Sequence, residues 1–116
     1  MNTNDYTASS NDTWLLTRKI LTESGVDAAI TLIGPGVETP PSDHPAPRPI
    51  VLLVSEGAVT ASVDRTHFIL RKDEALHVAP GKIHTLRNHT DAPAKVVAIT
   101  LPAPRRENPP LVVGFP

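Results

Sequence analysis

The sequence predicts an all-β protein, built as a sandwich or a barrel. Two observations carry this prediction. Short apolar and β-branched runs alternate with turn signals between residues 28 and 101, and prolines gather on either side of this region. Strands that recur every 8–12 residues or so are typical of β-sandwiches and barrels. The chain has 116 residues, the length of a single domain with one modest core.

The expected elements follow in chain order. Trp14–Glu23 fits either a helix capped by Asp12 or Thr13, or a strand, and the sequence leaves both alternatives open. After it, the sequence predicts strands at Ala28–Ile33, Ile50–Ser55, Ala58–Val63, Thr66–Leu70, Ala75–Val78, His84–Asn88 and Ala94–Leu101. The turns between them fall on Gly, Asp, Asn and Pro, the residues that favour turns.

Thirteen prolines set the boundaries of the expected domain. Six lie between Pro35 and Pro49, and five lie from Pro102 onward. Proline has no amide hydrogen to donate and is excluded from central strands, so we expect a loop or an irregular edge over Gly34–Pro49. The predicted organisation is a flexible N-terminal segment over residues 1–13, one barrel domain over 14–101 and an extended proline-rich tail over 102–116.

The amino-acid composition indicates which kinds of partner and which cell compartment to expect. Eleven Lys and Arg against twelve Asp and Glu give a net charge of −1, and only 3% of the residues are aromatic. Nucleic-acid binders usually carry a basic excess and stacking aromatic residues, so we expect no nucleic-acid partner. No apolar run reaches the roughly 20 residues that a spanning helix needs, so we expect no membrane partner. The polar start does not resemble a signal peptide and cysteine is absent, which favours a cytoplasmic protein.

The stretch Asp73–Asn88, DEALHVAPGKIHTLRN, resembles the second conserved motif of the cupin superfamily, G-x5-P-x-G-x2-H-x3-N. Gly81, His84 and Asn88 match this motif in register. Asp73 stands in place of its first glycine and Ala79 in place of its proline. The resemblance covers about residues 28 to 101. It implies a cupin-type double-stranded β-helix, or jelly-roll, barrel, with His84 on a strand face that looks into the barrel and Asn88 in a structural role.

The first cupin motif, G-x5-H-x-H-x(3,4)-E-x6-G, supplies two histidines and a glutamate that hold a metal together with the second-motif histidine. Counting forward from Gly36 places these histidines at Ser42 and His44. Alternatively, His44 is the first histidine and Ala46 takes the second place. Counting back from Gly57 places the glutamate at Ile50, so the first motif is degenerate.

His44 and His84 are therefore the metal ligands that the resemblance leaves. A divalent metal usually needs at least three protein ligands. The expected cofactor is accordingly either a weakly held divalent ion (Fe, Mn, Ni or Zn) completed by a third group, or no metal. The same residues predict a ligand pocket, in which His84 is the candidate catalytic residue.

The other candidate pocket residues are His44, His77, Arg48 and Leu86. Leu86 shares a strand face with His84, because side chains alternate along a strand. His77 either lies near His84 as a third nitrogen or faces the opposite side of its sheet. Arg48 either binds a carboxylate or phosphate at the barrel mouth, as guanidinium groups do in a bidentate way, or is solvated.

Two functions of different classes follow. The first is an enzyme that binds a small organic molecule in the barrel. The resemblance implies a metal-dependent dioxygenase, isomerase or lyase with a reduced ligand set, or metal-free acid–base chemistry by His84, alone or together with His44. The second is a metal-free, non-catalytic metabolite-binding or sensor protein that acts as a dimer. The apolar strands Ile50–Val54 and Val96–Leu101 carry more Val, Ile and Leu than one sheet face needs, so we expect a homodimer.

Overall fold

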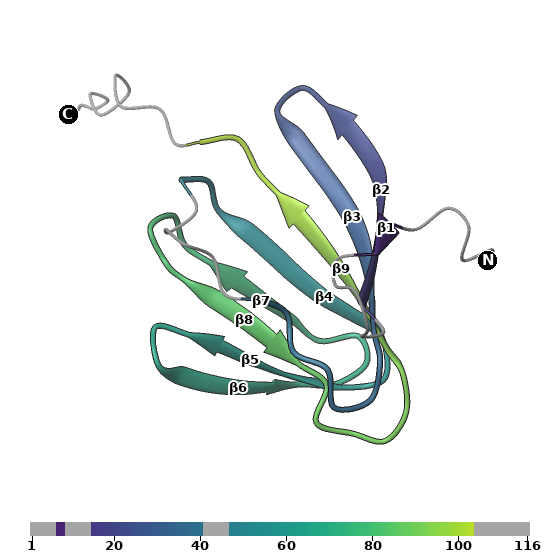
Figure 1. Ribbon diagram of the computed structural model, residues 1–116. Coiled ribbons are helices and arrows are strands. Elements are labelled where there is room, and N and C mark those ends of the chain that lie inside the picture. The colour runs from purple at the N-terminus through teal and green to yellow at the C-terminus, as the bar shows by residue number, and fades with distance from the viewer. Residues whose placement is uncertain (1–6, 9–14, 41–46, 104–116) are drawn as a thin grey trace.

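The computed structural model describes residues 7–8, 15–40 and 47–103, which form an antiparallel β structure without helices (Figure 1). Its strands are β1 (Thr7–Ala8), β2 (Leu15–Glu23), β3 (Val26–Ile33), β4 (Ile50–Glu56), β5 (Val59–Val63), β6 (Thr66–Leu70), β7 (Ala75–Val78), β8 (His84–Arg87) and β9 (Ala94–Thr100). The all-β prediction is confirmed. Over these residues there is also no helix long and apolar enough to cross a membrane.

Two sheets make up the barrel. The larger sheet has the strand order β1-β2-β3-β9-β4-β7, and the smaller has the order β6-β5-β8. Strands far apart in sequence become neighbours: β9 lies between β3 and β4, and β5 pairs with β8. The two sheets face each other as the walls of a jelly-roll barrel (Figure 1).

The predicted strands agree with the observed ones to within a few residues, and the ambiguous segment Trp14–Glu23 is resolved as a strand from Leu15 onward. Leu15 to Glu23 pair along their length with β3 through a turn at Ser24-Gly25, both of which have positive φ angles. A turn with two such residues matches the twist of a hairpin and is incompatible with a continuing helix. The sequence does not predict β1, which pairs with β2.

The region Gly34–Pro49 is an irregular edge in the part that the structure describes. The Gly36 amide donates to the Asn88 carbonyl oxygen at 2.8 Å, and the Thr39 amide donates to the Leu86 carbonyl oxygen at 2.8 Å. These bonds lay the segment beside β8, with one isolated bridge between Glu38 and Arg87. Pro40 follows this paired stretch, as the missing proline amide predicts.

The core lies between the two sheets. Its buried side chains are those that alternate inward on both sheets: Leu15, Ile33, Leu52, Val54, Val59, Ala61, Leu70, Val78, Leu86, Ala94 and Val96. Their packing fixes which face of each strand looks into the barrel, because a shift of one residue would turn every side chain to the other face. The predictions for residues 1–6, 9–14 and 104–116 lie outside the described residues, and Pro102 and Ala103 have no regular structure.

Candidate functional site

His84 begins β8 and faces the interior of the barrel. It pairs with Val63 of β5, two residues before the pair of Leu86 and Ala61. Leu86 and Ala61 are both buried in the core. Since side chains alternate along a strand, His84 points to the same side as Leu86. The structure thus places these two predicted pocket residues on one inner face, with His84 half-buried and Leu86 packed in the core.

Burial sets the charge state of His84. It lowers the pKa of the imidazole below its ordinary value of 6.5, because desolvation penalises the charged form. The ring makes no hydrogen bond or ion pair with another residue that the structure describes. His84 is therefore a neutral imidazole near pH 7, and it can both accept and donate a proton.

The wall opposite His84 combines apolar and polar side chains in one row. Asp27, Thr100, Ile50 and Val78 occupy matching positions on neighbouring strands β3, β9, β4 and β7. Val78 is buried and Ile50 packs against the core, so this row faces inward. Ile50, in the place where the resemblance expects a glutamate, presents an apolar surface to the barrel.

The guanidinium group of Arg48 lies at the Asp27 end of this row. Arg48 Nη1 donates to Asp27 Oδ2 at 3.0 Å, Arg48 Nε donates to the Leu101 carbonyl oxygen at 2.9 Å, and Arg48 Nη2 donates to the Gly25 carbonyl oxygen. Hydrogen bonds from Arg48 and Thr22 lower the pKa of Asp27 below its usual range. Three of the five donors of Arg48 therefore bind other parts of the chain, and its guanidinium ties three strand ends together.

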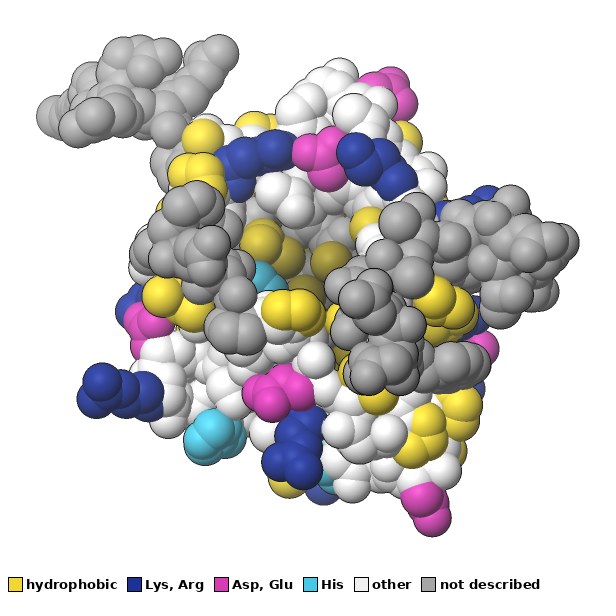
Figure 2. Space-filling model, in the orientation of Figure 1, with side chains coloured by type: hydrophobic (Ala, Val, Ile, Leu, Met, Phe, Trp, Pro, Cys, Tyr) yellow, Lys and Arg dark blue, Asp and Glu magenta, His cyan; other side chains and the backbone are white. Residues whose placement is uncertain are grey.

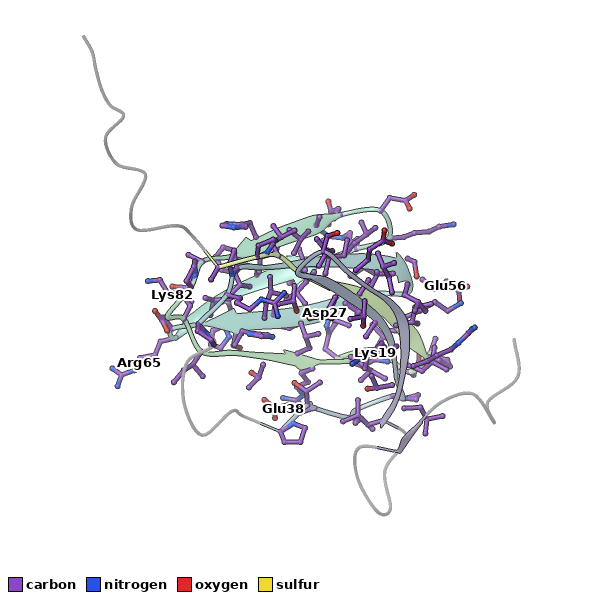
Figure 3. The ribbon with its side chains drawn as sticks, turned by 90° about the horizontal axis from the view of Figure 1, so that it is seen from above. Lys19, Asp27, Glu38, Glu56, Arg65 and Lys82 are labelled. Atoms are coloured by element: carbon purple, nitrogen blue, oxygen red, sulfur yellow. The ribbon has the colours of Figure 1, made fainter. Side chains whose placement is uncertain are left out.

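The charged rim and the apolar floor are visible on the surface. Figure 2 shows a hollow with hydrophobic and histidine side chains at its floor and basic and acidic side chains along its upper rim. Seen from above, Asp27 and Lys19 lie over the middle of the molecule (Figure 3). Lys19 pairs with Ala29 on the inner face of the larger sheet and also lowers the pKa of Asp27.

His77, the other predicted histidine that the structure describes, is not brought to His84. His77 is exposed and pairs with Val51, next to the inward-facing Val78. It therefore lies on the outer face of the larger sheet, the second of the two alternatives that its strand allowed. His44 lies outside the described residues. Asp27 and Thr100 were missed, and strand alternation carried from Ile33 back six residues is the signal that would have placed Asp27 inward.

The described donors do not form a metal site. No group of three His, Asp or Glu side chains able to hold an ion occurs in residues 15–40 and 47–103. Within the barrel, the Asp27 carboxylate is bound by Arg48, and Ile50 offers no ligand atom. His84 is the one second-motif ligand on the inner wall, and His44 lies outside the described residues.

Comparison with known proteins agrees with this architecture. The family model described as a cupin domain matches residues 29–100. The tetracenomycin polyketide synthase protein TcmJ of Streptomyces glaucescens is 35% identical over 97 residues, which cover 78% of this chain. The matched part spans 64% of the length of TcmJ.

Two solved structures show the same fold at low sequence identity. The Cnp3 cupin domain of Schizosaccharomyces pombe superposes with a TM-score of 0.73 at 18% identity, covering 92% of this chain and 78% of that one. The cupin domain of an XRE family transcriptional regulator from Enterobacter cloacae gives a TM-score of 0.70 at 20% identity, covering 80% and 100%. With the family match over most of the barrel, these findings show that the chain belongs to the cupin domain family.

Proposed function

We propose that this cupin binds a small, largely apolar organic molecule inside its barrel and that His84 transfers a proton to and from it. The observation that carries the proposal is a neutral, half-buried imidazole that faces an apolar interior and has no hydrogen-bond partner in the described part of the chain. No buried side-chain nitrogen or oxygen of the described residues lacks a partner, so the His84 ring nitrogens reach solvent and are open to a ligand. A neutral imidazole can take up a proton and return it, which suits general acid–base catalysis.

The similarity to TcmJ favours one class of ligand. TcmJ is named as a polyketide synthase protein, and polyketides are chains or rings in which carbonyl carbons alternate with methylene or phenolic carbons. Hydrogens on a carbon between two carbonyls are acidic. We therefore propose a ligand with a 1,3-dicarbonyl or phenolic group and an apolar body that fits against Ile50 and Leu86.

The chemistry is a proton transfer. The neutral His84 imidazole takes a proton from the carbon between two carbonyls, the C–H electron pair becomes part of an enolate, and the imidazolium returns the proton to carbon or oxygen. Atoms and electrons balance without an oxidant or reductant. The apolar wall keeps water away from the reacting atoms, and this strengthens the interaction of the imidazolium with the enolate.

Hydrogen–deuterium exchange at an aryl 1,3-diketone such as 1-phenyl-1,3-butanedione tests this proposal. We expect the protein to accelerate exchange of the central C–H, and His84→Gln to reduce the acceleration by about 10²–10⁴-fold, the usual range for a general acid–base. His77→Gln, on the outer face, is the matched control and should leave the rate unchanged. Exchange that is unaffected by His84→Gln contradicts the catalytic role.

The non-catalytic alternative predicts a different pair of results. The same diketone or a phenol would raise the melting temperature, and His84→Gln would weaken this effect, while exchange would stay at the rate of free solution. The barrel would then be a binding site and His84 a hydrogen-bonding group. Absence of both stabilisation and exchange with these probes argues against the ligand class itself.

We also propose that the protein is a homodimer, joined through the outer face of the larger sheet. Ile30 on β3, Val97 on β9 and Leu53 on β4 occupy one row across this face, and Ile99 and Val51 occupy the next. All five are half-buried, and they point away from the core. An apolar sheet face of this kind is self-complementary across a two-fold axis, which is the commonest arrangement of soluble oligomers.

Sedimentation equilibrium tests the dimer. Leu53→Lys places a charge in the middle of the outer face and should convert a dimer into a folded monomer. Ile69→Lys changes an exposed residue on the smaller sheet and is the matched control. A wild-type monomer at all concentrations, or a dimer that survives Leu53→Lys, contradicts this interface.

A further inference from the structure

A second cavity lies at the end of the smaller sheet where β5 ends and β8 begins. It has a volume of about 290 Å³ and is lined by Ser62, Asp64, Arg65, Ile83, His84 and Thr85. Ser62 and Thr85 are directly paired across β5 and β8, and their neighbours Ala61 and Leu86 point into the core. The two hydroxyl groups therefore face outward, into the cavity. His84, which faces the barrel interior, also lines this cavity.

Two basic side chains and one acidic side chain lie around this cavity. The Asp64 carboxylate accepts from Lys82 Nζ at 3.0 Å and from the Ile83 amide at 3.4 Å. Arg65 makes no ion pair or hydrogen bond with any residue of the described chain. Arg65 and Lys82 lie at the same end of the molecule (Figure 3). With Asp64 neutralised by Lys82, the guanidinium of Arg65 leaves the cavity with an excess positive charge.

The backbone at Arg65 is strained. Val63 pairs with Thr66, so Asp64 and Arg65 form a two-residue turn, and their φ angles are +47° and +73°. Such turns favour Asn or Asp at the first position and Gly at the second. An arginine at the second position costs free energy without a contact inside the chain to compensate for it. Strain of this kind, held at a cavity, points to a functional use of the side chain.

The hydroxyl groups complete the polar side. Ser62 Oγ is 2.7 Å from His67 Nδ1, which fixes its orientation. The Thr85 hydroxyl has no partner among the residues described. The Ile83 side chain also lines the cavity and is 40% exposed, so it offers an apolar surface there. A guanidinium and hydroxyl donors next to an apolar surface match a carboxylate attached to an apolar body.

We propose that this cavity binds a small organic carboxylate, with Arg65 and the Thr85 hydroxyl on the carboxylate and Ile83 against the apolar body. The proposal does not rest on the chemistry in the barrel, because Arg65, Thr85 and Ile83 carry it, although His84 borders both the cavity and the barrel interior. Benzoate is the probe: it carries the charge and a flat apolar ring. A fragment of this size should bind with a dissociation constant in the millimolar range.

Two-dimensional amide NMR of the full chain with benzoate tests the site. We expect shifts at Ser62, Arg65 and Thr85, and a loss of affinity of about tenfold in Arg65→Gly, the effect of one charge-assisted contact. Glycine suits the turn, so this variant should melt at a higher temperature than the wild type, which separates lost binding from lost folding. Ser24→Gly relieves the same kind of strain in the β2–β3 turn, where φ is +54°, and should leave benzoate binding unchanged.

The other outcomes each overturn part of the proposal. Unchanged benzoate affinity in Arg65→Gly, or no shifts around the cavity, removes the site. Equal binding of inorganic phosphate and benzoate shows that Ile83 contributes nothing, and it contradicts the assignment of an organic carboxylate. Binding of benzyl alcohol as tight as that of benzoate removes the role of the charge.

Discussion

At the scale of single residues, Asn88 shows how one side chain can hold a fold together. It is fully buried, and its Nδ2 donates to the carbonyl oxygens of Ile33 at 2.9 Å and Ala92 at 2.7 Å. Its Oδ1 accepts from the Thr90 amide at 2.9 Å and the Thr90 hydroxyl at 2.7 Å. These bonds join the end of β3 to the loop before β9, so the structural role that the resemblance implies for Asn88 is met by its contacts.

Asn88→Ala should therefore destabilise the protein by about 2–3 kcal/mol, because it leaves a buried carbonyl group without a donor. Urea unfolding measures the effect. Asn88→Asp keeps the acceptor and loses the donor, and it should also be destabilising at neutral pH. A loss below about 1 kcal/mol in Asn88→Ala would contradict the importance of these bonds.

His84 makes stability depend on pH. Its pKa in the folded state is lowered from 6.5, so below that value the unfolded chain binds a proton that the folded chain resists. Stability should consequently fall as the pH drops from about 6.5 toward the folded pKa, and it should be fully present above 6.5. Urea midpoints from pH 5 to pH 8 check this. His84→Gln should flatten the profile over this window, and His77→Gln should not.

At the scale of the elements, the turns decide how the strands pair. Gly57 ends β4 with a φ of +78°, and a Cβ atom there would lie 2.8 Å from the Pro93 carbonyl oxygen and 3.0 Å from Ala94 Cα. The close backbone approach brings the β4–β5 turn against the start of β9. Asp73, where the cupin motif has glycine, also has a positive φ, +68°, and aspartate tolerates this conformation better than most residues.

Gly57→Ala should cost about 3 kcal/mol, the sum of an unfavourable φ and a clash with backbone that cannot move aside. Gly36→Ala is the matched control, because its φ is +74° and no atom lies within 4 Å of its added Cβ. The control should cost about 1–2 kcal/mol. Equal losses in the two variants, measured by chemical denaturation, would show that the close approach to Pro93 has no energetic weight.

At the scale of the whole molecule, the barrel is held at its open end by Arg48. Its side chain reaches from the start of β4 to Gly25 in the β2–β3 turn, to Asp27 on β3 and to Leu101 after β9. These elements are 21 to 53 residues away in sequence. Arg48, which the sequence predicts as a possible ligand-binding residue, thus binds other parts of the protein itself.

Arg48→Ala should lower the free energy of unfolding by about 1–2 kcal/mol, mainly through two backbone carbonyls that lose a donor. Arg48→Lys keeps the charge but cannot reach three partners at once, and it should recover only part of the loss. Thermal unfolding of both variants measures this. Retention of full stability in Arg48→Ala, together with weaker binding of the diketone probe, would instead support a role in ligand binding.

The sequence by itself determined the fold class, most strand positions and the inward direction of His84. The first two follow from local patterns, the alternation of apolar residues and the turn residues, whereas the inward direction of His84 is what the resemblance to the second cupin motif implies. The hairpin of β2 was also within reach, since Ser24-Gly25 is a turn signal. The sequence of Trp14–Glu23 could not exclude a helix, because a strand is stabilised by hydrogen bonds to a neighbouring strand. The local sequence does not reveal that neighbour.

Only the tertiary structure decided which residues share a site. His77 and His84 are seven positions apart in the chain, yet β7 and β8 belong to different sheets, and His77 turns outward. Asp27 and Arg48 meet, and Ser62 and Thr85 form one cavity wall, because strand order places them together. Such contacts depend on the pairing of strands that are far apart in sequence. The side chains that this pairing brings together determine what chemistry a cupin barrel can carry out.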